Sequence, residues 1–185
     1  MRTDFQETYN LSNFQIAQLQ YLGKTLLSEI SKIIIMGILF HQHFYLYIFA
    51  ILLLCLLRTS TGGLHCHTYL SCLAMSIGYI FTSIYICPHI EVAKVAALVL
   101  LPICILVNYL IGPVTSDCRP ELKGTLRTKG KVKSVVIILI FFIVTIIIPE
   151  NAYLTVGFWI IILHTIQLVI AKIRKEIIYE KEILI

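Results

Sequence analysis

One segment of fifteen residues, 58–72, brings together an arginine, a pair of glycines, two histidines and two cysteines. In chain order these are Arg58, Gly62, Gly63, His65, Cys66, His67 and Cys72. Cysteine and histidine supply the thiol nucleophiles, general bases and metal ligands of many protein sites. The segment is therefore where we expect chemistry, and three interpretations of it compete.

Two of these interpretations involve no catalysis. His65, Cys66, His67 and Cys72 are competent metal ligands, but the segment has neither the C-x-x-C nor the H-x-x-x-H spacing that is typical of zinc sites. We therefore expect no metal and no other cofactor. The second interpretation is structural: the polar residues cap a helix that begins near Thr68, which composition alone would favour.

The third interpretation pairs a thiol nucleophile with a histidine base. Cys72 lies just inside the apolar stretch 68–87, near its N-terminal end, where a peptide could reach it while water is limited. Burial raises the pKa of a thiol, so a thiolate at such a position needs a cationic neighbour. Arg58 and His65 are the candidates for that neighbour.

The spacing of His65 and Cys72 limits how the two side chains can meet. Seven residues of one straight helix span about 10.5 Å, whereas proton transfer requires a separation of about 3 Å. We therefore expect the chain to fold back before Cys72, with the Gly62-Gly63 pair supplying the backbone freedom. Spacing alone leaves Cys66 and His67 open as substitutes.

The composition excludes a soluble setting for this chemistry. Hydrophobic residues make up 58% of the 185 residues and charged residues 14%, whereas soluble domains carry about 25% charged residues. Five stretches together contain one charged residue, Lys94; they are residues 33–57, 68–87, 92–111, 134–148 and 152–171. The pattern predicts a polytopic membrane protein, and it excludes a soluble enzyme, a disordered chain and a nucleic-acid-binding domain.

We predict a single all-α membrane domain over residues 1–185, with about five to six transmembrane helices plus an N-terminal amphipathic helix. A bilayer core of about 30 Å needs roughly 20 apolar residues as helix. Three of the stretches meet that length directly, and 134–148 does so if Lys133 snorkels and the helix starts earlier. Because His41-Gln42-His43 interrupts the long stretch 33–57, we favour two short helices there.

The two ends of the chain differ from the spans at 33–171. Residues 1–32 predict an amphipathic helix on the membrane surface, because apolar side chains recur there at helical spacing: Leu19, Leu22, Leu26, Ile30 and Ile33. Residues 172–185 form a tail with four Lys or Arg.

Basic residues indicate which side of the membrane a loop faces. The loop 112–133 is strongly basic, with Arg119, Lys123, Arg127, Lys129, Lys131 and Lys133 against two acidic residues. This loop and the tail 172–185 are therefore predicted to be cytoplasmic. Counting back through the spans places the candidate catalytic segment 58–72 at the cytoplasmic side as well.

Four residues of that segment match a known motif. Arg58 is followed by Gly63 five residues on, His65 two after that, and Cys72 seven further. In these spacings, and in its length, amphipathic start, basic loop and C-terminal hairpin, the chain resembles AgrB, the accessory gene regulator B family of Gram-positive quorum sensing.

The resemblance implies a multi-pass cell-membrane cysteine endopeptidase that processes a propeptide of the AgrD type. It implies Cys72 as the nucleophile, His65 as the general base and acid, and Arg58 and Gly63 as supporting residues. Cleavage would leave a thioester on Cys72, which a cysteine of the propeptide converts to a thiolactone; a serine there would give a lactone. The resemblance also makes a homodimer an expectation, beside the propeptide and the lipid bilayer as partners; no nucleic acid is expected.

Substrate binding is assigned to the basic loop by the same resemblance, because propeptides of this family have an acidic C-terminal region. The candidate residues are Arg119, Lys123, Arg127, Lys129 and Lys131. These charges also enforce orientation, and the sequence favours neither role over the other.

The alternative function is that of a non-enzymatic small transporter or membrane assembly factor. Lys94, Asn108 and His164 are polar groups within predicted spans, and such residues often mark a conduit. Lys94 lies near the end of its helix, where snorkelling accounts for it, and the other two are isolated in the sequence.

Overall fold

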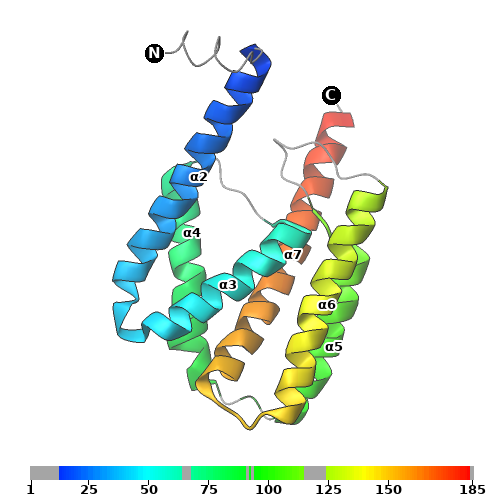
Figure 1. Cartoon of the computed structure of the whole chain (residues 1–185). Helices are drawn as coiled ribbons and strands as arrows, with labels where there is room; N and C mark the ends of the chain where they lie inside the picture. The colour runs from blue at the N-terminus through cyan, green and yellow to red at the C-terminus, as the bar shows by residue number, and fades with distance from the viewer. Residues whose placement is uncertain (1–12, 64–67, 91, 93, 115–123, 184–185) are drawn as a thin grey trace. The chain divides into compact units, whose positions relative to one another are not determined.

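The computed structural model describes residues 13–63, 68–90, 92, 94–114 and 124–183 (Figure 1). The regular structure within these ranges is helical, which confirms the predicted all-α class. The chain divides into two compact units, Met1–His41 and Gln42–Ile185.

The first unit contains the long helix α2 (Asn13–Leu39). The helix predicted for residues 1–32 is confirmed from Asn13 onward, and it continues seven residues past its predicted end. Within α2 the Lys32 ammonium lies 2.6 Å from a carboxylate oxygen of Glu29, one turn earlier. Such pairs at i,i+3 stabilise a helix modestly.

The stretch 33–57 differs from the prediction of two short helices. Helix α2 ends at Leu39, the short 3-10 helix η1 (His41–His43) follows, and α3 (Phe44–Thr61) begins directly after it. The interruption is therefore confirmed, but residues 33–39 belong to a helix of 27 residues and not to a separate short one. No proline or turn-forming pair precedes Leu39, so the amphipathic helix propagates through these residues.

Within the described residues, five helices are long and apolar enough to cross a membrane. They cover His41–Thr61, Tyr69–His89, Lys94–Ile111, Thr125–Ile147 and Ala152–Ile177. The elements are α3 with η1, α4 (Tyr69–Phe81) with the short turns Thr82–Ile86 and Cys87–His89, α5 (Lys94–Ile111), α6 (Thr125–Ile147) and α7 (Ala152–Ile183). The protein is accordingly a multi-pass membrane protein, as its composition predicts.

Two helices extend further than the apolar stretches that predict them. Helix α6 begins at Thr125, nine residues before Ser134, and α7 continues to Ile183. The first turns of α6 and most of the tail 172–185 are therefore helical. Long basic side chains can reach water from such helix ends, so a helix need not stop where its apolar run stops.

Successive spans alternate in direction, so that α3 and α7 are parallel. Phe49 near the start of α3 packs edge-on against Tyr153 near the start of α7, with ring centroids 5.6 Å apart. Near the other end of α3, Arg58 bonds to Gln167, which lies midway along α7. We call the end of the five-helix unit that holds Arg58 the motif end, and the end that holds Tyr153 the opposite end.

Helix α7 is the most enclosed span. It packs against α3 and α5, and α6 packs against the same two helices (Figure 1). In its most apolar window 61% of the residues are buried, against 22–39% for the other four spans. Side chains of α7 are therefore placed to reach several helices at once.

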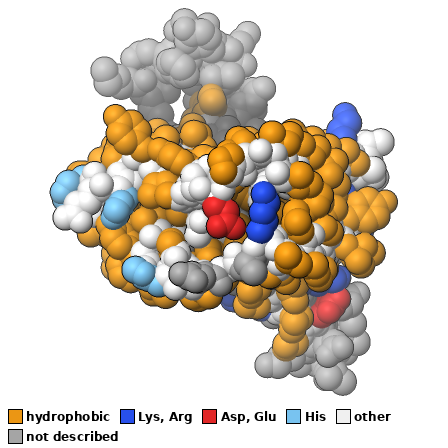
Figure 2. Space-filling view, turned by 90° about the horizontal axis from the view of Figure 1, so that it is seen from below, with side chains coloured by type: hydrophobic (Ala, Val, Ile, Leu, Met, Phe, Trp, Pro, Cys, Tyr) orange, Lys and Arg blue, Asp and Glu red, His pale blue; other side chains and the backbone are white. Residues whose placement is uncertain are grey.

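The five-helix unit turns apolar side chains outward and polar side chains inward. Exposed apolar residues occur on every span, including Leu52, Leu56, Leu70, Val99, Leu106, Leu139, Ile143, Ile166 and Ile170. Buried polar residues include Ser60, Thr61, Ser76, Asn108, Ser134, His164, Thr165 and Gln167. Figure 2 shows the opposite end, where hydrophobic side chains surround an acidic and a basic side chain near the centre of the view. This distribution suits a bilayer, in which lipid covers apolar surface and polar groups bond inside.

Two glycines end α3 at the motif end. Gly62 has φ +74° and Gly63 has φ +153°, and both are conformations that glycine tolerates best. The Val114 N–H donates to the Thr61 carbonyl at 2.8 Å, which ties the end of α3 to the segment after α5. Since α4 begins only at Tyr69, the expectation that 58–72 is not one straight helix is confirmed.

Replacing glycine by alanine should change the stability in opposite directions at two helical positions, of which one lies at the contact of α6 with α3. Gly130→Ala should destabilise the protein by about 1–3 kcal/mol, because its Cβ would lie 2.6 Å from the Ser60 carbonyl oxygen. Gly78→Ala on α4, with nothing within 4 Å of its Cβ, should be neutral or stabilising by up to about 1 kcal/mol. Thermal unfolding in detergent measures both; equal shifts in Tm would contradict the packing of α6 on α3.

Candidate functional site

Three of the four motif residues are described, and all three lie at the motif end. Arg58 is in the last turn of α3, Gly63 follows that helix, and Cys72 is in the first turn of α4. His65 lies outside the described residues, as do Cys66 and His67. The expectation that this segment binds no metal and the pairing of His65 with Cys72 therefore both stay predictions.

The start of α4 is capped as the structural interpretation predicts. Thr68 is the N-cap, and its hydroxyl accepts a hydrogen bond from the Ser71 N–H at 3.3 Å. The Cys72 N–H donates to the Thr68 carbonyl at 3.1 Å, so Cys72 belongs to the first helical turn. Capping fixes where the helix begins and thereby where Cys72 stands, so the structural and the catalytic interpretations are compatible.

Cys72 lies on the inward face of α4. Seven residues at 100° each return within about 20° of the same direction, so Cys72 and Tyr79 share one face of the helix. Ser76, between them on that face, is buried, and Cys72 itself is half-buried. The Tyr79 hydroxyl donates to the Ile160 carbonyl of α7 at 2.6 Å, which turns this face toward α7.

Arg58 is held by two residues that the sequence does not single out. Its Nη2 donates to Oε1 of Gln167 at 3.3 Å, and its Cζ lies 5.9 Å from the centroid of the Tyr79 ring. Gln167 had a sequence signal, since it is an amide inside a predicted membrane span, but nothing in the sequence names its partner 109 positions away.

Two of the three polar residues that suggested a conduit, His164 and Asn108, are bonded to neighbouring helices. His164 Nε2 lies 2.8 Å from the Thr61 hydroxyl of α3, and the Asn108 amide of α5 donates to the Thr165 hydroxyl at 2.9 Å. Both residues are fully buried. They join α7 to α3 and α5, which is a packing role and does not favour the transporter alternative.

The basic residues lie partly on a helix and close to the motif. Arg127 and Lys129 are exposed in the first turns of α6, and the Lys131 ammonium lies 5.4 Å from the Tyr109 ring centroid. Helix α6 touches α3 where Gly130 faces the Ser60 carbonyl, two residues from Arg58. Arg119 and Lys123 lie outside the described residues.

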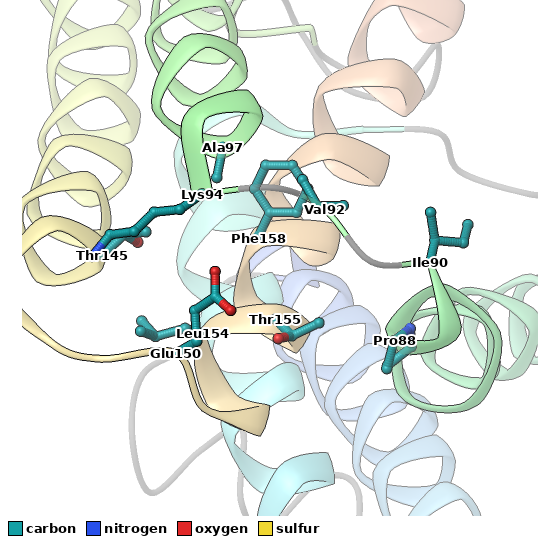
Figure 3. Close-up of a pocket in the computed structure, with 10 residues that line it drawn as sticks. All are labelled: Pro88, Ile90, Val92, Lys94, Ala97, Thr145, Glu150, Leu154, Thr155 and Phe158. Carbon is teal, nitrogen blue, oxygen red and sulfur yellow. The ribbon is translucent and has the colours of Figure 1, made fainter.

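A pocket of about 590 Å³ opens at the opposite end of the unit. Figure 3 shows Lys94 reaching along it toward Thr145, and the Glu150 carboxylate pointing into it. Its other lining residues are Pro88, Ile90, Val92, Ala97, Leu154, Thr155 and Phe158. The pocket contains no residue of the motif, so it is separate from the site around Arg58 and Cys72.

The fold and the motif end define a class: a small multi-pass membrane protein with an arginine, a glycine turn and a thiol gathered at one end of its helices. The family profile described as accessory gene regulator B, AgrB, matches residues 4–168. A protein of Clostridium beijerinckii described as AgrB-like is 29% identical over 148 residues, covering 75% of this chain and 72% of the relative. No solved structure matches the chain.

The chain belongs to the AgrB family, since the family profile covers most of its length, including the motif. The resemblance noted in the sequence is thereby confirmed. Family membership gives the protein a role in processing the propeptide of agr quorum sensing, with that propeptide and the membrane as its partners.

The contribution of the Thr61–His164 hydrogen bond to stability can be measured by comparing the same substitution at Thr61 and at the nearby Thr59. Thr61→Val should destabilise the protein by about 1–2 kcal/mol, because it leaves the buried His164 imidazole without its partner. Thr59→Val is the matched control: its hydroxyl also donates to a carbonyl of its own helix, but the side chain is exposed. Thermal unfolding in detergent should separate the two variants, and equal stability would contradict the α3–α7 contact.

Proposed function

We propose that this protein is a membrane cysteine endopeptidase that cleaves an AgrD-type propeptide and closes the product into a thiolactone. Cys72 is the nucleophile and His65 the general base and acid. The observation that carries the proposal is that Arg58, at the end of α3, contacts Tyr79 on the Cys72-bearing face of α4. Arg58 of the motif thus packs against the helix that carries Cys72, in a protein of the AgrB family.

The reaction proceeds in two acyl transfers. His65 takes the proton of the Cys72 thiol, the sulfur attacks the scissile carbonyl, and His65 gives the proton to the leaving amine as the peptide bond breaks. The N-terminal part of the propeptide is then held as a thioester on Cys72. A cysteine thiol within that part attacks the thioester, forms the thiolactone, and returns a proton to the Cys72 sulfur.

The location of Cys72 suits this chemistry. It lies in the first turn of α4, where the partial positive charge of a helix N-terminus favours a negative group. A half-buried position restricts water, which would otherwise hydrolyse the thioester. The second step is intramolecular and therefore has a large effective concentration. One thioester replaces another, so the sequence of steps needs no ATP.

The motif end faces the cytoplasm of a Gram-positive cell in this proposal, because basic residues gather there. The same residues recognise the acidic C-terminal region of the propeptide. Four of them, from Arg127 to Lys133, occupy the start of α6, and its first turn has no acidic residue. Arg127 lies in the first turn, where a positive side chain at the positive end of the helix dipole costs stability, which favours a role beyond solvation.

The catalytic role of Cys72 predicts a loss of processing that another cysteine does not share. With an AgrD-type propeptide that the wild-type chain cleaves in the same membrane, Cys72→Ala and His65→Ala should each abolish cleavage. Cys55→Ala, which removes an exposed thiol on α3, should leave cleavage unchanged. Mass spectrometry of the wild-type protein should detect the acyl group on Cys72; cleavage that persists without Cys72 would refute the protease proposal.

The recognition role of the basic segment predicts a charge-dependent effect on substrate use. Lys129→Glu should lower kcat/KM for the propeptide about tenfold and weaken the dependence on salt, because it repels an acidic tail. Arg174→Glu, the same charge change at an exposed position of α7, should leave kcat/KM unchanged. Labelling of loop cysteines checks that both variants keep their orientation, and equal kinetics in both would assign the Lys129 charge to orientation alone.

A further inference from the structure

Gln167 is a buried amide with a polar partner in a different helix. Its side chain is 7% exposed, in the part of α7 that lies in the interior of the five-helix unit. An amide in this setting costs free energy unless it is hydrogen-bonded. The partner is Arg58, whose Nη2 donates to the Gln167 Oε1 at 3.3 Å.

The Arg58 guanidinium is held from a second side by Tyr79. The ring centroid lies 5.9 Å from Cζ, and the Tyr79 hydroxyl is itself anchored on the Ile160 carbonyl of α7. A planar guanidinium responds to such contacts by orientation as well as by charge. The Arg58 Nε is buried without a hydrogen-bond partner among the described residues. Burying an unpaired donor lowers the stability of the fold, so stability alone does not explain an arginine at this position.

The same contacts also set the rotation of α4. Because Tyr79 and Cys72 share one helix face, a Tyr79 ring that packs on Arg58 directs the Cys72 face toward α3 and α7. The Gln167 amide also lies beside the glycine of the motif: a Cβ built on Gly63 would be 4.0 Å from Oε1. One side chain of α7 is thus adjacent to two motif residues.

We propose that Gln167 is a positioning residue for the catalytic segment. Its amide oxygen orients the Arg58 guanidinium and holds it against Tyr79, so that α3 and α4 present Arg58 and Cys72 in a fixed relation. Gln167 acts through Arg58 and does not contact the reacting atoms. This inference rests on the proposed endopeptidase function and adds to it a residue outside the motif.

The test compares two replacements of similar size in the full chain, reconstituted in lipid nanodiscs with a propeptide that the wild-type chain cleaves. Gln167→Glu keeps an acceptor oxygen for Arg58, whereas Gln167→Met removes it. The single-turnover rate of acyl-enzyme formation should fall about tenfold to a hundredfold with Gln167→Met and stay within about threefold of wild type with Gln167→Glu.

A double-mutant cycle separates positioning from general stability. In an Arg58→Lys background, Gln167→Met should cause little further loss, because the guanidinium that it orients is already absent. Thr165→Val is the matched control on the same helix, since its partner is Asn108 and not Arg58. Its effect on the rate, whatever its size, should be the same in both backgrounds.

The outcomes distinguish this inference from the function on which it rests. Equal losses from Gln167→Met in the two backgrounds, or a loss from Gln167→Glu as large as that from Gln167→Met, overturn the positioning role. If Gln167→Met does not fold, the retained or lost rate of Gln167→Glu decides. Cleavage that survives Cys72→Ala overturns the endopeptidase instead.

Discussion

Polar side chains within a bilayer must bond to one another, and the five-helix unit depends on that constraint. Helix α7 carries His164, Thr165 and Gln167 in its buried part. Each bonds to a different residue: His164 to Thr61, Thr165 to Asn108, and Gln167 to Arg58. Lipid leaves apolar helix faces without strong preference for one neighbour, so these hydrogen bonds select how α3, α5 and α7 pack.

The same constraint places the motif. The hydrogen bonds of α7 gather near the end of α3, where Gly62 and Gly63 turn the chain out of the helix. A helix end is where backbone groups lose their partners, and the Thr61 carbonyl is satisfied by the Val114 N–H beyond α5. Arg58 therefore lies where α3 and α7 are bonded to each other by two pairs of side chains.

The periodicity and the charge pattern of the sequence predict most of the helices correctly. The apolar stretches, the interruption after Leu39 and the cap at Thr68 follow from local rules that need no tertiary contact. Those rules are least informative at helix ends. Helix α6 starts at Thr125 within a basic segment, and α2 continues to Leu39. Long basic side chains can reach water from within a helix, so the basic segment does not mark the start of α6. A helix without a breaker propagates, so the composition does not mark the end of α2 either.

The sequence by itself determined that this is an AgrB-family membrane protein, because the spacing of Arg58, Gly63, His65 and Cys72 and the order of its apolar stretches are properties of one chain. Only the tertiary structure decided which residue supports Arg58. Gln167 is separated from it by 109 positions, and a buried amide can bond to any donor that the packing brings within reach. The sequence shows that such an amide needs a partner, and only the packing of α7 against α3 determines which one it has.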